Sequence, residues 1–127
     1  MKTFRDLIIW QKPMTLVTKV YKISNTFPNN EAYGLTSQIR RCSISIPSNI
    51  AKGYGRNYTN DYIHFLRIAT GSLYELQTQH YCRFYSNKYS KDIYKNISGL
   101  YGRCSSSQQN IYLLMAKNDG SRYIQCL

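Results

Sequence analysis

Residues 33–59, YGLTSQIRRCSISIPSNIAKGYGRNYT, constrain the fold more than any other part of this chain. Apolar residues recur there at spacings that keep one face of a 3.6-residue helix apolar, and a second stripe on the same helix is wholly polar. The apolar stripe consists of Leu35, Ile39, Cys42, Ile46 and Ile50, and the polar stripe of Gln38, Arg41, Ser45, Ser48 and Lys52. The pattern predicts a long amphipathic helix.

Proline and glycine should shape this helix. Pro47 lies inside it and lacks a backbone donor, so we expect a bend there. Gly53 and Gly55 follow, and glycine is the usual residue for a left-handed helix stop. The sequence therefore predicts a bent helix over residues 32–54, and then a tight corner before Thr59.

Two further helices are expected, over residues 8–26 and 60–82. In the first, the main apolar face should carry Trp10, Met14, Val17 and Tyr21, with Ile9, Leu16, Val20 and Ile23 widening it. Pro13 is tolerable there only within the first turn, where its missing donor costs nothing. In the last helix, Tyr62, Leu66, Ala69, Leu73 and Leu76 predict the core seam, broadened by Phe65 and Ile68. Gly71 and Ser72 are expected to permit a close helix crossing.

Several long strings carry a family resemblance: FRDL and WQK near the start, then YGLTSQIRR, SIPSNIA, GYGR and GSLYELQTQ. Over about residues 4–79 the chain resembles the bacterial 23S rRNA-intervening-sequence protein family, also called four-helix bundle proteins. The resemblance implies an all-α, antiparallel up-and-down helical bundle. It also implies a homo-oligomer, because some members form pentameric rings that bind nucleic acid, including accessory proteins of diversity-generating retroelements. For most members no biochemical activity is established.

Beyond Gln79 the character of the chain changes. Residues 80–127 are rich in tyrosine, contain the polar run CSSSQQN, and show only short apolar segments at 92–100 and 111–117. We expect a single domain over residues 1–127, in which the fourth helix is degraded or partial and the part from 80 onwards is divergent and weakly structured. Two origins remain open: an authentic divergent ending, or a change of reading frame near codon 80.

The charge indicates a class of partner. Seventeen basic and six acidic residues give a formal net charge of +11 over 127 residues. Such a field favours phosphate-rich partners or anionic surfaces, although a basic surface can also serve solubility alone. No stretch approaches the roughly 20 apolar residues of a membrane span, and the apolar run near the start is short for a signal peptide. We therefore expect a cytoplasmic protein that does not bind membranes.

The sequence gives no support for catalysis, a metal or a cofactor. Its acidic residues are scattered singly, and no triad pattern surrounds His64. The glycines of residues 53–56 lack the further glycine or lysine of a phosphate loop. Cys42, Cys82, Cys104 and Cys126 contain no C-x-x-C pair, and His80 with Cys82 falls short of a four-ligand zinc site. We expect a protein that is not an enzyme.

Nucleic-acid binding is a more specific hypothesis than catalysis. Arginine and lysine can hold phosphate oxygens, and tyrosines can stack on exposed bases. The candidate residues are Arg40, Arg41, Lys52, Arg56, Tyr54 and Tyr58. Two alternatives stay open: Tyr54 and Tyr58 cover the bundle end, or Arg41 pairs with Glu75 or Asp61. We expect binding to RNA or DNA, with RNA favoured and little sequence specificity. The competing function is an adaptor that holds a protein partner such as a reverse transcriptase.

Overall fold

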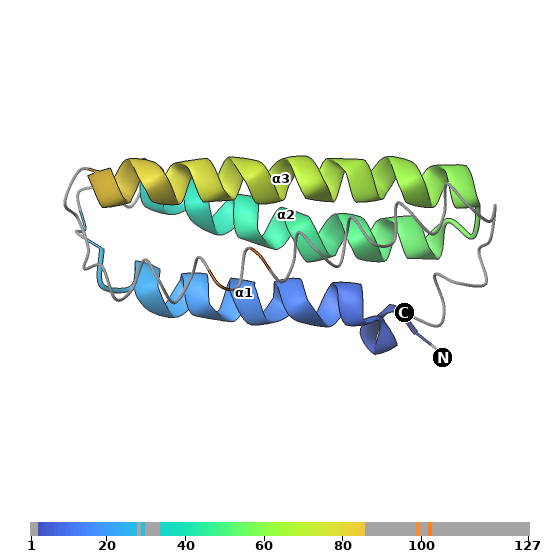
Figure 1. Ribbon diagram of the computed structural model, residues 1–127. Coiled ribbons are helices and arrows are strands. Elements are labelled where there is room, and N and C mark those ends of the chain that lie inside the picture. Colours follow the sequence, from blue (N-terminus) through green and yellow to red (C-terminus); the bar gives the residue numbers. More distant parts are fainter. Residues whose placement is uncertain (1–2, 28, 30–33, 86–98, 100–101, 103–127) are drawn as a thin grey trace.

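The computed structural model describes residues 3–27, 29, 34–85, 99 and 102. A short 3-10 helix, η1 (Phe4–Asp6), leads into three long helices, α1 (Ile8–Ser24), α2 (Leu35–Gly55) and α3 (Thr59–Tyr85). The long helices run antiparallel in an up-and-down order, and α2 packs against both α1 and α3 (Figure 1). The predicted all-α class and the three helices are confirmed. The expected fourth element after about residue 90 and both short apolar segments lie outside the described residues, apart from Gly99 and Gly102.

The helical pattern locates the contact between α2 and α3 correctly. Ile39, Ile46 and Ile50 of α2 are fully buried, and Cys42 is 8% exposed. The predicted α3 seam of Tyr62, Leu66, Ala69, Leu73 and Leu76 is buried along its whole length. Ile68 is different, because its side chain faces outward and is 39% exposed. These two seams form the hydrophobic core that orients the polar face of α2 toward solvent.

Helix α1 faces the core with the residues that we expected only to widen its apolar face. Its buried residues are Ile9, Pro13, Leu16, Val20 and Ser24. Trp10, the first residue of the predicted face, is only partly buried against the core, and Tyr21 is 37% exposed. Both faces have apolar residues at helical spacing, so the spacing alone did not separate the core seam from its margin.

Pro13 and Pro47 both lie inside helices. Pro13 is beyond the first turn of α1, contrary to our expectation, because the helix already begins at Ile8. The helix therefore lacks the hydrogen bond that this residue would donate, and the proline ring is buried. Helix α2 continues through Pro47 without interruption, and the bend there stays a prediction.

The corner between α2 and α3 uses a different residue from the glycines we expected. Neither Gly53 nor Gly55 has a positive φ; the residue in the left-handed region is Asn57, with φ 61°. Asparagine is one of the few side chains that tolerate this conformation. Helix α3 then starts, with the amide of Tyr62 donating to the carbonyl of Tyr58 at 2.9 Å.

Gly53 serves helix packing instead. A Cβ atom built on Gly53 would lie 2.9 Å from the Cβ of Phe65 and 3.3 Å from the Cα of Tyr62, so α3 approaches α2 too closely for any side chain. Gly71, to which we had assigned this role, is exposed and has nothing within 4 Å of the equivalent position. Its neighbour Ser72 does lie at the crossing, where its hydroxyl is 2.9 Å from that of Ser45.

Candidate nucleic-acid interface

Arg40 connects two helices. Its Nε donates to the hydroxyl of Ser24 at 2.6 Å, and its Nη2 donates to Oδ1 of Asn25 at 2.9 Å. The guanidinium also lies over the ring of Tyr21, 5.3 Å from its centroid. These three contacts attach α2 to the end of α1. Two of the five N–H donors of Arg40 are thus used within the fold.

Replacing Arg40 by alanine should lower the free energy of unfolding by about 1–3 kcal/mol, because two charge-assisted hydrogen bonds are lost. The neighbouring variant Arg41→Ala is a matched control. It removes the same charge from an exposed side chain, and should change stability by less than about 0.5 kcal/mol. Urea unfolding of both variants measures the difference. Equal stabilities would contradict a structural role for Arg40.

Arg41 lies on the edge of a polar groove between α2 and α3. The groove has a volume of about 380 Å³ and is lined by Gln38, Arg41, Cys42, Ser45, Ser72, Glu75 and Gln79. In the described part of the chain, the guanidinium of Arg41 donates to the hydroxyl of Ser37 at 3.0 Å and forms no ion pair with Glu75 or Asp61. The exposed Arg41 therefore keeps donors that face solvent.

Lys52, Arg56 and Tyr58 lie around the corner where α2 ends. Lys52 and Arg56 are exposed, and Tyr58 is 72% exposed, more than any other large hydrophobic side chain that the structure describes. The Arg56 guanidinium lies 5.5 Å from the centroid of the Phe65 ring, which supports its position by a cation–π contact. Tyr58 is thus an exposed aromatic side chain two residues after the exposed Arg56.

Tyr54 is directed inward rather than toward the solvent. It packs against the core, and its ring meets that of Tyr62 edge to face at 6.5 Å between centroids. Burial raises the pKa of the Tyr62 phenol, with a smaller contribution from Tyr54. The geometry of Tyr54 matches the alternative in which this tyrosine covers the bundle end.

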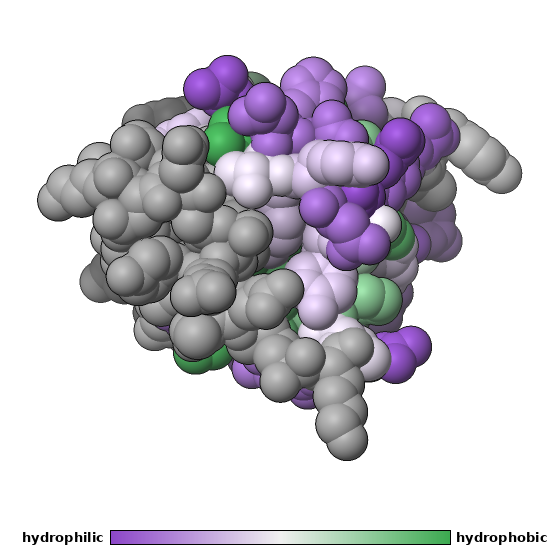
Figure 2. Space-filling model, turned by 90° about the vertical axis from the view of Figure 1, so that its right-hand side faces the viewer, coloured by the Kyte–Doolittle hydropathy of each residue, from purple (hydrophilic) through white to green (hydrophobic). Residues whose placement is uncertain are grey.

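The six predicted residues therefore do not form one cluster. Arg40 faces α1, whereas Arg41 and Lys52 share the outer face of α2. Eleven positions separate Arg41 from Lys52, which corresponds to about three turns and about 16 Å along the helix. Figure 2 views the end of the molecule where α2 meets α3, and hydrophilic side chains gather over the upper part of this end. Arg41, Lys52 and Arg56 are thus spread along the length of α2 and do not converge on one position.

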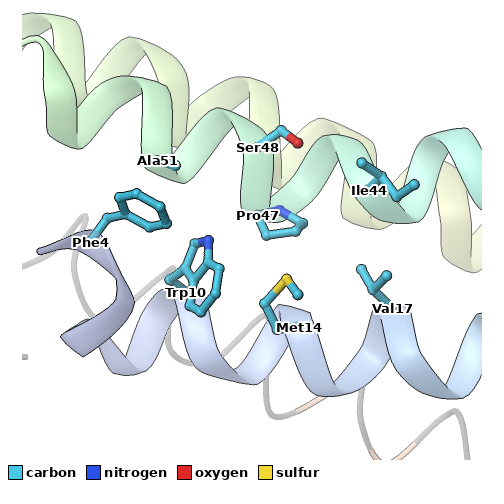
Figure 3. Close-up of a pocket in the computed structure, with 8 residues that line it drawn as sticks. All are labelled: Phe4, Trp10, Met14, Val17, Ile44, Pro47, Ser48 and Ala51. Carbon is cyan, nitrogen blue, oxygen red and sulfur yellow. The ribbon is translucent and has the colours of Figure 1, made fainter.

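A second surface feature is apolar. Phe4, Trp10, Met14 and Val17 face Ile44, Pro47, Ser48 and Ala51 across a groove of about 290 Å³ between α1 and α2 (Figure 3). The rings of Phe4 and Trp10 meet edge to face, 5.3 Å apart. Ile44 is 41% exposed on the α2 side. Sequence analysis missed this groove because it assigned Trp10, Met14 and Val17 to a core face and Ser48 to the polar stripe, and left Ile44 and Ala51 outside both stripes.

Within residues 3–27 and 34–85, no three histidine, cysteine, aspartate or glutamate side chains come together as a metal site would require. No described helix has the length and apolar character needed to cross a membrane.

Burial raises the pKa of the Cys42 thiol to about 12, which keeps it protonated and unreactive.

Comparisons with known proteins agree on the fold. A solved structure of a protein with unknown function from the S23 ribosomal protein family of Bacteroides thetaiotaomicron VPI-5482 is similar, with a TM-score of 0.76 and 17% sequence identity. The similarity covers 82% of this chain and 97% of that chain. No curated protein matches the sequence. At this identity the likeness supports the helical-bundle fold and nothing further.

A family model described as 23S rRNA-intervening sequence protein matches residues 5–110. The match continues past Gln79, where we expected the resemblance to end, so the family pattern extends into the segment that we described as divergent. Because the match spans most of the chain, this protein belongs to the 23S rRNA-intervening sequence protein family.

Proposed function

We propose that the protein binds RNA through the phosphate backbone and has no enzymatic chemistry of its own. The outer face of α2 carries this proposal: Arg41 and Lys52 lie along it, Arg56 follows at its end, and α2 contains no acidic residue. Neither does α1. A phosphate chain that follows α2 therefore meets cations without a neighbouring carboxylate on the same helix.

Tyr58 adds a contact of a different kind. Its ring is exposed at the corner next to Arg56, and base–aromatic stacking contributes about 1–3 kcal/mol per base in other proteins. Stacking accepts every base, so it would strengthen binding to single strands with little sequence preference. The name of the family, which refers to 23S rRNA, favours RNA over DNA. We include self-association in the proposal on the family resemblance alone.

The test is direct binding of a fluorescein-labelled 20-nucleotide single-stranded RNA at about 50 mM salt, where phosphate contacts are strong. The double variant Arg41→Ala/Arg56→Ala should lose at least about tenfold in affinity. Lys19→Ala/Lys22→Ala is the matched control, because it removes the same charge from exposed positions on α1. It should lose less. Equal losses would mean that net charge matters and the α2 face does not.

The adaptor remains the second candidate, and the apolar groove of Figure 3 favours it. Trp10 and Met14 are only partly buried there, and an apolar groove can accept side chains of a protein partner. If the full chain binds no RNA at about 50 mM salt, where phosphate contacts would be strong, the adaptor function replaces our proposal.

A further inference from the structure

The groove beside Arg41 has a fixed floor. The Cys42 thiol donates to the carbonyl oxygen of Ser72 at 3.0 Å, and the hydroxyls of Ser45 and Ser72 are 2.9 Å apart. Asn49 donates to both the carbonyl and the hydroxyl oxygen of Ser45, at 2.7 and 3.0 Å. The hydrogen-bonding groups of these small side chains are thus paired with groups inside the fold. A ligand in the groove would therefore interact with the longer side chains above them.

The longer side chains present acceptors next to a cation. Gln79 donates through Nε2 to Glu75 at 3.4 Å, while its Oε1 is buried and has no hydrogen-bond partner among the described residues. The Glu75 carboxylate is exposed and does not pair with Arg41, although both line the groove. The groove is thus suited to a ligand that brings hydrogen-bond donors to the exposed carboxylate of Glu75 and an anion to Arg41.

We propose that this groove binds one unpaired guanine base of the RNA strand, with Arg41 on an adjacent phosphate. This inference rests on the proposed function. An unstacked base can be recognised through its Watson–Crick edge. Guanine offers a ring N–H and an amino group side by side on that edge, which match the two oxygens of a carboxylate. Cytosine and adenine offer only an amino group there, and uracil only a ring N–H. A volume of about 380 Å³ accommodates one base.

The experiment uses the full chain and four labelled 12-nucleotide RNAs, which consist of uridine with G, A, C or U at one central position. The wild-type protein should bind the G-containing RNA about tenfold more tightly than the other three, in line with one good bidentate contact. In Glu75→Gln this preference should fall to within about twofold, because the amide replaces one acceptor by a donor. Its affinity for the all-uridine RNA should not decrease.

Asp61→Asn is the matched control, since it removes the same charge from an exposed acid at the start of α3, outside the groove. It should retain the guanine preference. Equal binding of all four RNAs by the wild-type protein, a preference for another base, or a preference that survives in Glu75→Gln would each overturn the guanine site while leaving the phosphate contacts intact. Absence of binding to every RNA would instead overturn the proposed function, and this inference with it.

Discussion

Lowering the pH from 7 to 4 should reduce the free energy of unfolding by about 3 kcal/mol through His80 alone. This side chain is 2% exposed near the end of α3, and burial lowers its pKa from 6.5 to about 4. The unfolded chain therefore takes up a proton between pH 6.5 and 4 that the folded protein does not accept. The contribution of His80 to the free energy of unfolding is fully present above about pH 6.5 and is lost as the pH falls toward 4.

Chemical denaturation at pH 7, 5.5 and 4 measures this loss. Carboxylates also titrate near pH 4, so the comparison should be made with His80→Gln, which keeps polar groups but cannot be protonated in this range. The variant should lose about 3 kcal/mol less than the wild type over the same interval. His64→Gln serves as the control, because His64 is already exposed to solvent. If His80→Gln and the wild type lose the same stability, His80 is not buried in its neutral form.

Replacing Gly53 by alanine should lower the free energy of unfolding by about 1–3 kcal/mol, even though alanine is the better helix former by about 1 kcal/mol. The added methyl would lie 2.9 Å from the Cβ of Phe65 and 3.3 Å from the backbone of Tyr62, which forces α2 and α3 apart. Backbone atoms cannot move aside as a flexible side chain can. The cost should therefore exceed the gain in helix propensity.

Gly71→Ala provides the matched control. It makes the same substitution inside α3, at an exposed position with nothing within 4 Å. It should raise the free energy of unfolding by about 1 kcal/mol. Thermal or urea unfolding of the two variants should thus move in opposite directions. Stabilisation by both substitutions would show that the helices do not cross closely at Gly53.

Sequence spacing predicts α2 and α3 well because each has a single apolar seam. It does not identify the centre of the core face of α1, where the residues around Ile9 and those around Trp10 are both apolar at helical intervals. Only the position of α2 decides between these faces. The two glycines illustrate the same limit: Gly53 and Gly71 are both isolated small residues, and the crossing point of the helices determines which one needs to lack a side chain.

For the candidate site, too, the sequence predicts which residues of one helix are exposed but not which residues of different helices meet. The polar stripe of α2 correctly indicates that Arg41 and Lys52 are exposed. It cannot show that the adjacent Arg40 reaches Ser24 and Asn25, because those contacts join residues that are distant in the sequence. The groove formed by Arg41, Glu75 and Gln79 was missed for the same reason. A polar stripe on each of two adjacent helices is the one signal that could have indicated it.

The salt dependence of RNA binding tests the central claim most directly. For the wild-type protein, the logarithm of the binding constant should fall linearly with the logarithm of salt, with a slope of about −0.7 to −0.9 per neutralised phosphate. In Arg41→Ala/Arg56→Ala the slope should become shallower by about two contacts, while stability stays nearly unchanged. A slope equal to that of the wild type, with or without a loss of stability, would contradict phosphate binding by the outer face of α2.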